Sequence, residues 1–196
     1  MARDSATEVG RTRMGGVAVL AAAGAVVLFL LLGPGVAPAS ASCPHAGAHP
    51  HDVSLAKLRM AVTCIVNNER IRHHRHGLTP NRQLRRAAQK HTNVMLRKDC
   101  FKHACAGEVG LNRRVRRSGY TKGQKAWHFA EDLGYDNSPR QMVKLLLQSA
   151  FNRRNLFNRA FRDVGVGVGW GTPKTGLDDS KFETYTLVFG WRRAHR

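Results

Sequence analysis

The sequence predicts an α+β fold, in which several helices precede a pair of strands near the C-terminus. Two stretches with apolar residues at helical spacing begin at Leu55 and Asn81. Further on, valines alternate with glycines over residues 164–169, and residues 184–191 are rich in aromatic and β-branched side chains. These two later stretches are expected to pair as antiparallel strands.

Residues 1–41 have the three parts of a secretory signal peptide. Arg11 and Arg13 precede an uninterrupted apolar run over residues 14–32, and the sequence ASA at residues 39–41 provides the small side chains that a signal peptidase requires. Cleavage after this motif predicts a secreted, extracellular protein. The alternative is an uncleaved N-terminal membrane anchor with the domain outside, because an apolar run of this length is just long enough to span a bilayer.

The chain is strongly basic, with 32 Lys and Arg against 13 Asp and Glu and a formal charge of +19. Such a field attracts polyanions, which predicts anionic envelope polymers or an anionic lipid surface as partners. Four arginines concentrate charge on one short stretch: Arg113, Arg114, Arg116 and Arg117. No aromatic residues interleave with them as a stacking platform would require, so specific nucleic-acid recognition is not expected. A merely solvated basic surface is the alternative.

Four cysteines follow the signal segment: Cys43, Cys64, Cys100 and Cys105. An even number in an oxidising compartment predicts two disulfides, for which three pairings are possible. Cys100 and Cys105 can close locally, which would leave Cys43 to join the N-terminal segment to the helix that carries Cys64. The C-x4-C spacing lacks the second close pair of a structural zinc site, so no metal is expected there.

The elements can then be assigned in order. Residues 42–54 are polar and broken by prolines, which is typical of a linker, and Ser54 at its end is a candidate helix cap. Apolar residues at helical spacing predict one helix from Leu55 until Gly77 and a second that starts at Asn81.

Three further elements follow. A short basic helix is expected over residues 109–118, and Ser138-Pro139 opens another helix, because a capping residue precedes a proline at the first helical position. Residues 149–170 then place a polar turn, a short helix and the glycine-rich strand in succession. Glycine weakens a strand unless another backbone or a ligand comes close, so the glycine face should lie beneath another element.

Four motifs in this order resemble one protein family. They are CIVNNER at residues 64–70, FKH at 101–103, WHFAEDLG at 127–134, and SAFNRRNL with FRDVGVG at 149–167. Together they are similar to the bacterial, SCP-like extracellular branch of the CAP superfamily (cysteine-rich secretory proteins, antigen 5 and pathogenesis-related 1 proteins). The resemblance implies a domain over residues 55–192. Its fold would be a three-layer α-β-α sandwich with a small, mostly antiparallel sheet and a central cleft.

The resemblance also implies which residues line that cleft. Many members hold two histidines and one or two glutamates there, sometimes around a divalent metal. His103 matches the first histidine, and Glu131 matches the glutamate of a Gly-Glu-Asn-Ile motif that here reads AEDL. Asn152 stands where the second histidine is expected, and Ser149 falls near the position of a second glutamate.

The replacement of that histidine by Asn152 decides the expected function. An amide oxygen is a poor substitute for imidazole, and a transition metal generally needs at least three protein ligands, so no metal or other cofactor is expected. We therefore expect a monomeric, non-catalytic binding module that holds an unidentified ligand in its cleft at or outside the cell envelope.

Three other interpretations remain open. A hydrolase of peptide or ester bonds could use His103 as acid or base, with Glu131 as its orienting partner. Alternatively, the same two side chains could form a buried hydrogen bond that only holds two loops together. The third interpretation is a basic envelope-adhering or antimicrobial protein, in which the charge itself is the function.

Overall fold

The computed structural model describes residues 42–194, and the predicted signal peptide lies outside the described residues. Within this range, no helix is both long and apolar enough to cross a membrane. The helices are α1 (Leu55–Arg72), α2 (Arg82–Arg97), α3 (Leu111–Arg117), α4 (Pro139–Gln148) and α5 (Ala150–Leu156). The strands are β1 (Thr79–Pro80), β2 (Gln124–Asp136), β3 (Asp163–Trp170) and β4 (Glu183–Ala194).

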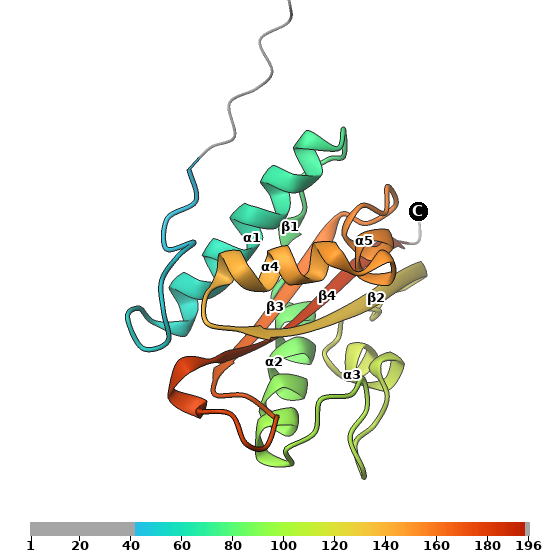
Figure 1. Ribbon diagram of the computed structural model, residues 1–196. Helices are drawn as coiled ribbons and strands as arrows, with labels where there is room; N and C mark the ends of the chain where they lie inside the picture. The colour runs from blue at the N-terminus through green and yellow to red at the C-terminus, as the bar shows by residue number, and fades with distance from the viewer. Residues whose placement is uncertain (1–41, 195–196) are drawn as a thin grey trace, which may run out of the picture. The chain divides into compact units, whose positions relative to one another are not determined.

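The strands form one sheet in the order β1-β3-β4-β2. Strand β4 pairs antiparallel with both β2 and β3, whereas β1 pairs parallel with β3. Figure 1 shows α1, α4 and α5 on one side of the sheet and α2 and α3 on the other. The predicted three-layer α+β architecture, the mostly antiparallel sheet and the pairing of the two C-terminal strands are therefore confirmed.

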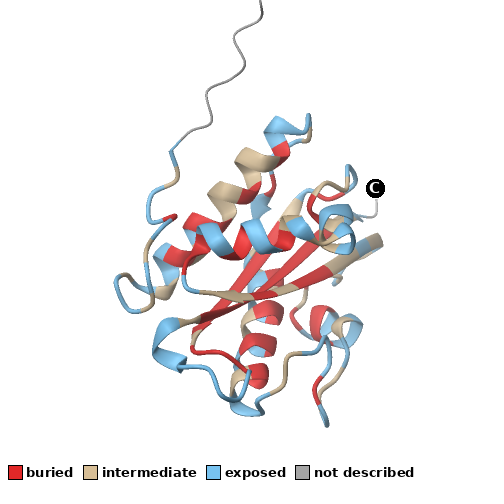
Figure 2. Ribbon diagram, in the orientation of Figure 1, coloured by how far each residue is buried: buried red, intermediate tan, exposed pale blue. Residues whose placement is uncertain are grey.

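The hydrophobic core lies on both faces of β3 and β4, which are buried along most of their length (Figure 2). On one face, α1 and α4 pack against the sheet through side chains such as Leu58, Val62, Met142 and Leu146. On the other face, a smaller cluster joins α2 and α3 to β4, with these members: Leu84, Ala87, Ala88, Val115, Tyr120 and Val188. The sheet thus separates two packed layers.

The glycine face of β3 lies directly beneath α2. A Cβ atom added at Gly167 would lie only 2.5 Å from the carbonyl carbon of Ala88, and one added at Gly165 would lie 2.2 Å from the backbone nitrogen of Arg85. Real Cβ atoms do not approach main-chain atoms this closely. The prediction that another element covers the glycine face is therefore confirmed, and the absence of side chains sets how closely α2 approaches the sheet.

Helix α1 ends at Arg72, earlier than the predicted end at Gly77. The side chain of Asn67 bonds both main-chain groups of Leu78, accepting from its nitrogen at 2.7 Å and donating to its oxygen at 3.0 Å. The buried Arg70 donates through Nε to the carbonyl of His76 at 2.8 Å. These bonds fold the following segment back along the helix, so the helical path cannot continue to Gly77.

Both disulfides have the expected pairing, Cys43 with Cys64 and Cys100 with Cys105. The first attaches residues 42–54 to α1. Within that segment Ala46 is buried, and its carbonyl accepts a hydrogen bond from the backbone nitrogen of Arg140 at 2.8 Å. The segment expected as a linker contains no helix or strand, but it packs against the domain.

Candidate functional site

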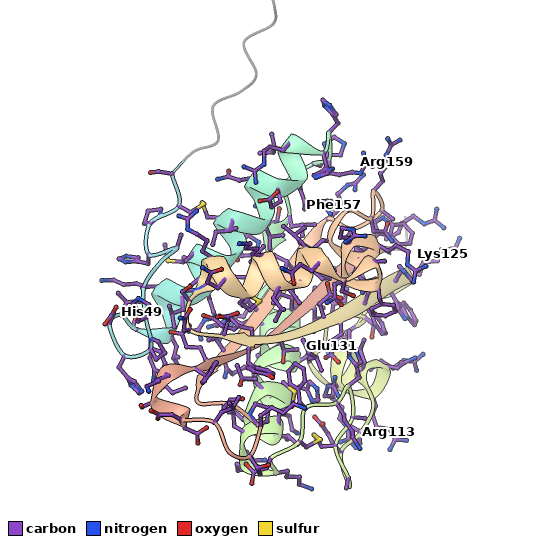
Figure 3. All side chains as sticks on the ribbon, viewed as in Figure 1. His49, Arg113, Lys125, Glu131, Phe157 and Arg159 are labelled. Carbon is purple, nitrogen blue, oxygen red and sulfur yellow. A yellow bond between two sulfur atoms is a disulfide. The ribbon has the colours of Figure 1, made fainter. Side chains whose placement is uncertain are left out.

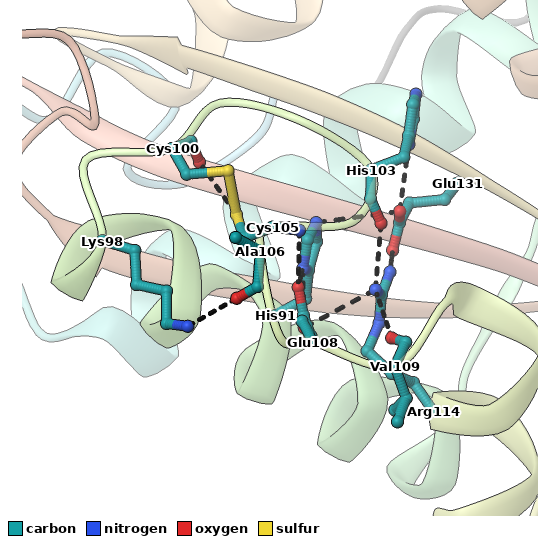
Figure 4. Close-up of a disulfide and its surroundings, with 10 residues drawn as sticks. All are labelled: His91, Lys98, Cys100, His103, Cys105, Ala106, Glu108, Val109, Arg114 and Glu131. Atoms are coloured by element: carbon teal, nitrogen blue, oxygen red, sulfur yellow. Dashed lines mark hydrogen bonds and ion pairs between the residues drawn. A yellow bond between two sulfur atoms is a disulfide. The ribbon is translucent and has the colours of Figure 1, made fainter.

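The structure brings His103 and Glu131 into direct contact (Figure 4). Glu131 lies on β2, and His103 lies in the loop between α2 and α3. Nδ1 of His103 is 3.0 Å from Oε1 of Glu131. The histidine side chain is 55% exposed, whereas the glutamate side chain is only 1% exposed. The imidazole therefore covers the carboxylate and is the only member of the pair that faces solvent.

A buried arginine holds the other oxygen of Glu131. Nη2 of Arg114 donates to Oε2 at 2.5 Å, and Nη1 donates to the main-chain carbonyls of His103 at 3.0 Å and Val109 at 3.3 Å. Arg114 was expected to be one of four arginines that concentrate charge on this short helix, but it is only 3% exposed and its charge is directed inward. Arg114 and Val115 form the buried side of α3, so the guanidinium points into the protein.

A second histidine and carboxylate pair, which the sequence analysis did not identify, extends this cluster. Nδ1 of the buried His91 lies 2.9 Å from both carboxylate oxygens of Glu108. Oε1 of Glu108 is 3.5 Å from Nη1 of Arg114, and Nε2 of His91 is 3.8 Å from Oε1 of Glu131. We call His91, His103, Glu108, Arg114 and Glu131 the ion network (Figure 4). It runs from the surface at His103 into the interior at His91.

The ion network changes the acidity of His103. Its hydrogen bond to Glu131 is the main reason that the pKa of His103 is raised, while partial burial of the imidazole acts in the opposite direction. Because Nδ1 is engaged with the carboxylate, proton exchange with a ligand would use Nε2. This geometry orients His103 as an acid or base, but it leaves Glu131 covered.

Asp132, the next residue on β2, points to the opposite face of the sheet. Its side chain is fully buried, and Oδ1 accepts a hydrogen bond from Nδ2 of Asn155 on α5 at 2.6 Å. Oδ2 has no hydrogen-bond partner within residues 42–194. Burial raises the pKa of Asp132 to about 7, although the bond from Asn155 opposes this shift. A carboxyl group thus connects β2 to α5 in the layer opposite the ion network.

The two remaining residues predicted for the cleft lie at the start of α5. Ser149 is the helix cap, and its Oγ accepts a hydrogen bond from the backbone nitrogen of Asn152 at 3.4 Å. Within the described part of the chain, no hydrogen bond joins either residue to His103 or Glu131. The same part contains no group of three or more His, Cys, Asp or Glu side chains placed to hold a metal ion.

Two adjoining grooves lie between α2 and α3, with volumes of about 370 and 250 Å³. Arg114 lines both grooves, and Glu108 lines the smaller one. Five exposed cationic side chains surround them: Arg86, Lys90, Arg97, Lys98 and Arg117. Neither α2 nor α3 contains an acidic residue. We call this surface the basic face. Figure 3 shows the nearby Arg113 projecting outward, whereas Glu131 lies within the molecule.

Comparisons with known proteins agree with this architecture. The model of the cysteine-rich secretory protein (CAP) family matches residues 65–189. A solved extracellular protein with an SCP domain from Bacillus anthracis is 22% identical and gives a TM-score of 0.53, over 72% of this chain and 44% of that one. This chain thus corresponds to less than half of that protein. An outer surface protein from Borrelia burgdorferi is 14% identical, with a TM-score of 0.60 over 74% of this chain and 99% of that one. No match was found among curated protein sequences.

Proposed function

Because the chain belongs to the cysteine-rich secretory protein (CAP) family, we propose that it is a non-catalytic binding module that acts at or outside the cell envelope. Its location is supported by the predicted signal peptide and by two structural relatives described as extracellular and outer surface proteins. The observation that carries the binding role is the basic face. Its proposed partner is an anionic envelope polymer.

The basic face has the charge and shape that such a polymer requires. The charge of Arg114 is balanced locally by Glu108 and Glu131, so the exposed side chains around the grooves provide the free positive charge. The grooves are small, which suits single phosphate or carboxylate groups better than a whole chain. A polymer with regularly spaced anionic groups could therefore lie across α2 and α3 and place successive groups in the two grooves.

The state of Glu131 argues against catalysis. Its two oxygens are occupied by His103 and Arg114, and the side chain is almost completely buried. A general base must reach the proton that it abstracts, and a metal-ligating carboxylate must reach the metal. Glu131 does neither in this arrangement. We infer that it stabilises the loop that contains His103.

Salt-dependent release from immobilised polyphosphate tests the binding role. The variant Lys90→Gln/Arg117→Gln removes two charges that line both grooves. Its matched control is Lys144→Gln/Arg154→Gln, which removes two exposed charges from α4 and α5 on the other side of the sheet. The groove variant should elute at clearly lower salt than the control, because direct contacts are lost in addition to net charge. Equal shifts for the two variants would mean that only net charge matters and would refute the basic face as the site.

A hydrolase is the second candidate, and the orientation of His103 favours it. An exposed imidazole whose Nδ1 is held by a carboxylate is the usual arrangement of an acid–base histidine. The test is the hydrolysis of small ester and peptide substrates by the wild type and by His103→Ala. The non-catalytic proposal expects the same background rate for both proteins. Turnover that depends on His103 would overturn it in favour of the hydrolase.

A further inference from the structure

Among the described residues, one edge of strand β3 has a neighbouring strand only at its start. Its neighbour β1 pairs with it at only two positions, Thr79 with Asp163 and Pro80 with Val164. The backbone nitrogen of Asn81 then donates to the carbonyl of Val164 at 2.7 Å, after which the chain turns away into α2. Beyond Val164, no strand within residues 42–194 lies beside this edge.

In a strand, the N–H and C=O groups of every second residue point toward the same edge of the sheet. At Val168 the side chain of Gln89 takes the place of a neighbouring strand, since Oε1 accepts from the backbone nitrogen at 3.2 Å and Nε2 donates to the carbonyl at 2.9 Å. Val164 and Val168 both direct their main-chain groups outward, so Val166 between them does the same. No hydrogen bond from a described residue meets Val166 on this side. The N–H and the C=O of Val166 thus have no hydrogen-bond partner among the described residues, and the residue itself is 4% exposed.

A groove of about 660 Å³ lies over this position, between α1 and α2. Val164 and Val166 line it on the sheet, and Ala56 and Met60 line it on α1. The side chain of Met60 is unusually open for an apolar residue, because the residue is 70% exposed. The volume lies within the range of ligand sites, and an adaptable methionine suits a bound apolar group. We call this the edge groove.

Three arginines give the edge groove a positive charge: Arg59, Arg82 and Arg85. No acidic residue lines it, and none of the three arginines forms an ion pair with a described residue. Nη1 of Arg59 donates to Oε1 of Gln89 at 3.3 Å. Burial, and then the nearby charge of Arg85, lower the pKa of Arg59, so the positive charges crowd one another. An anionic group in the groove would relieve this repulsion.

We propose that the edge groove binds a short extended peptide with acidic side chains, which adds to β3 at Val166 along the line of β1. One residue of the peptide would pair its own N–H and C=O with those of Val166, as in other cases of strand addition. Alternate side chains would then reach the apolar wall at Met60 and the arginines of the rim. This site is separate from the basic face, and the inference does not depend on the function proposed above.

Fluorescence anisotropy with a labelled peptide tests the charge requirement. The probe is an amidated hexapeptide of alternating Val and Glu, and its counterpart carries Lys in place of Glu. The Glu peptide should bind saturably and the Lys peptide should not. The variant Arg59→Gln/Arg85→Gln should weaken binding at least tenfold, whereas the matched control Arg113→Gln/Arg116→Gln on α3 should not. Equal effects of the two variants would overturn the proposal.

Three further measurements test the strand addition itself. Two methylated peptides are compared, one with methyl groups on the odd-numbered backbone nitrogens and one with them on the even-numbered nitrogens. Both keep the charge of the peptide, but only one of them loses the N–H groups that face β3. That peptide should bind about tenfold more weakly. Ala56→Trp should block binding because it fills the groove without changing the charge. Laurate supplies an acid and an apolar chain without an amide, so it should bind more weakly than the peptide. The peptide proposal is refuted if laurate binds as tightly as the peptide, or if neither methylated peptide binds more weakly. Either result would assign the groove to an acidic amphiphile.

Discussion

His103 covers Glu131, and a single arginine holds both residues in place. Arg114 donates to the carboxylate of Glu131 and also to the main-chain carbonyl of His103. The disulfide between Cys100 and Cys105 closes the loop around the histidine. The loop is therefore held to α3 through its backbone and to β2 through the His103 side chain, and the disulfide restrains it internally. A cluster anchored in this way is suited to holding a shape, which agrees with a binding module better than with a reacting site.

The raised pKa of His103 predicts how stability depends on pH. The folded state binds the imidazole proton more tightly than the unfolded chain does. The contribution of His103 to the free energy of unfolding is therefore fully present below about pH 6.5, and it is lost as pH rises through the pKa of the folded state. The wild type should therefore exceed His103→Gln in unfolding free energy by more at pH 6 than at pH 9. NMR titration of the ring should show the raised pKa, and Glu131→Gln should lower it. An unchanged titration in Glu131→Gln would contradict this interpretation.

Arg114 should be the most sensitive position of the ion network. Arg114→Met leaves the buried carboxylates of Glu131 and Glu108 without their cation, and breaking a buried pair in this way costs about 3–5 kcal/mol. Unfolding by denaturant measures the loss. Arg113→Met, at an exposed neighbour, should change stability by no more than about 0.5 kcal/mol.

A double variant separates the loss of charge pairing from the loss of packing. Arg114→Met/Glu131→Met replaces both partners with apolar side chains, so it should be more stable than Arg114→Met alone. If the two substitutions instead destabilise additively, the network contributes mainly through packing rather than through compensation of charge.

Elements with a strong local signal were predictable from sequence. Ser54 and Ser138 cap α1 and α4 as expected, because a side-chain acceptor before an apolar helical pattern is a local feature. The alternating valines of β3 were similarly clear, since both the period and the glycines are visible in the sequence. The covered glycine face followed from the chemistry of glycine alone.

Strands β1 and β2 were not predicted, since each lacks a local signal. Strand β1 is only two residues long and exists because Asn67 fixes Leu78 just before it. Strand β2 carries Glu131 and Asp132 in its middle, which interrupts the expected alternation of polar and apolar residues. Pairing with β4 along almost its whole length compensates for this weak pattern.

Only part of the ion network could be read from the sequence. His103 and Glu131 were visible through the family resemblance, whereas Arg114 looked like one more residue of a basic run. His91 gave a weak signal, because it lies on the apolar face of α2, where a buried histidine requires a partner. That partner is Glu108, 17 residues further along the chain. Only the tertiary fold shows that these residues share a site.

The close contact between β3 and α2 predicts a large cost for a very small substitution. In Gly167→Ala the added methyl group would meet the main chain of Ala88 at 2.5 Å, and main chain cannot turn aside as a side chain can. Overpacking of this kind should destabilise the protein by about 1–3 kcal/mol. Gly47→Ala is the matched control, because nothing lies within 4 Å of its new Cβ atom. Equal unfolding free energies for the two variants would mean that α2 moves away from the sheet without cost.

Asp132 provides a further test, because it stands where the motif of the family has asparagine. Burial raises the pKa of this carboxyl to about 7, so the folded protein favours its protonated form and stability is lost as pH rises from about 4 to 7. Asp132→Asn keeps the shape and the acceptor for Asn155 but cannot ionise. The variant should match the wild type near pH 4 and exceed it by about 2–4 kcal/mol at pH 8. The exposed Asp99→Asn should show no such gain. A variant that is less stable than the wild type by the same amount at both pH values would mean that α5 requires the carboxyl group itself at this position.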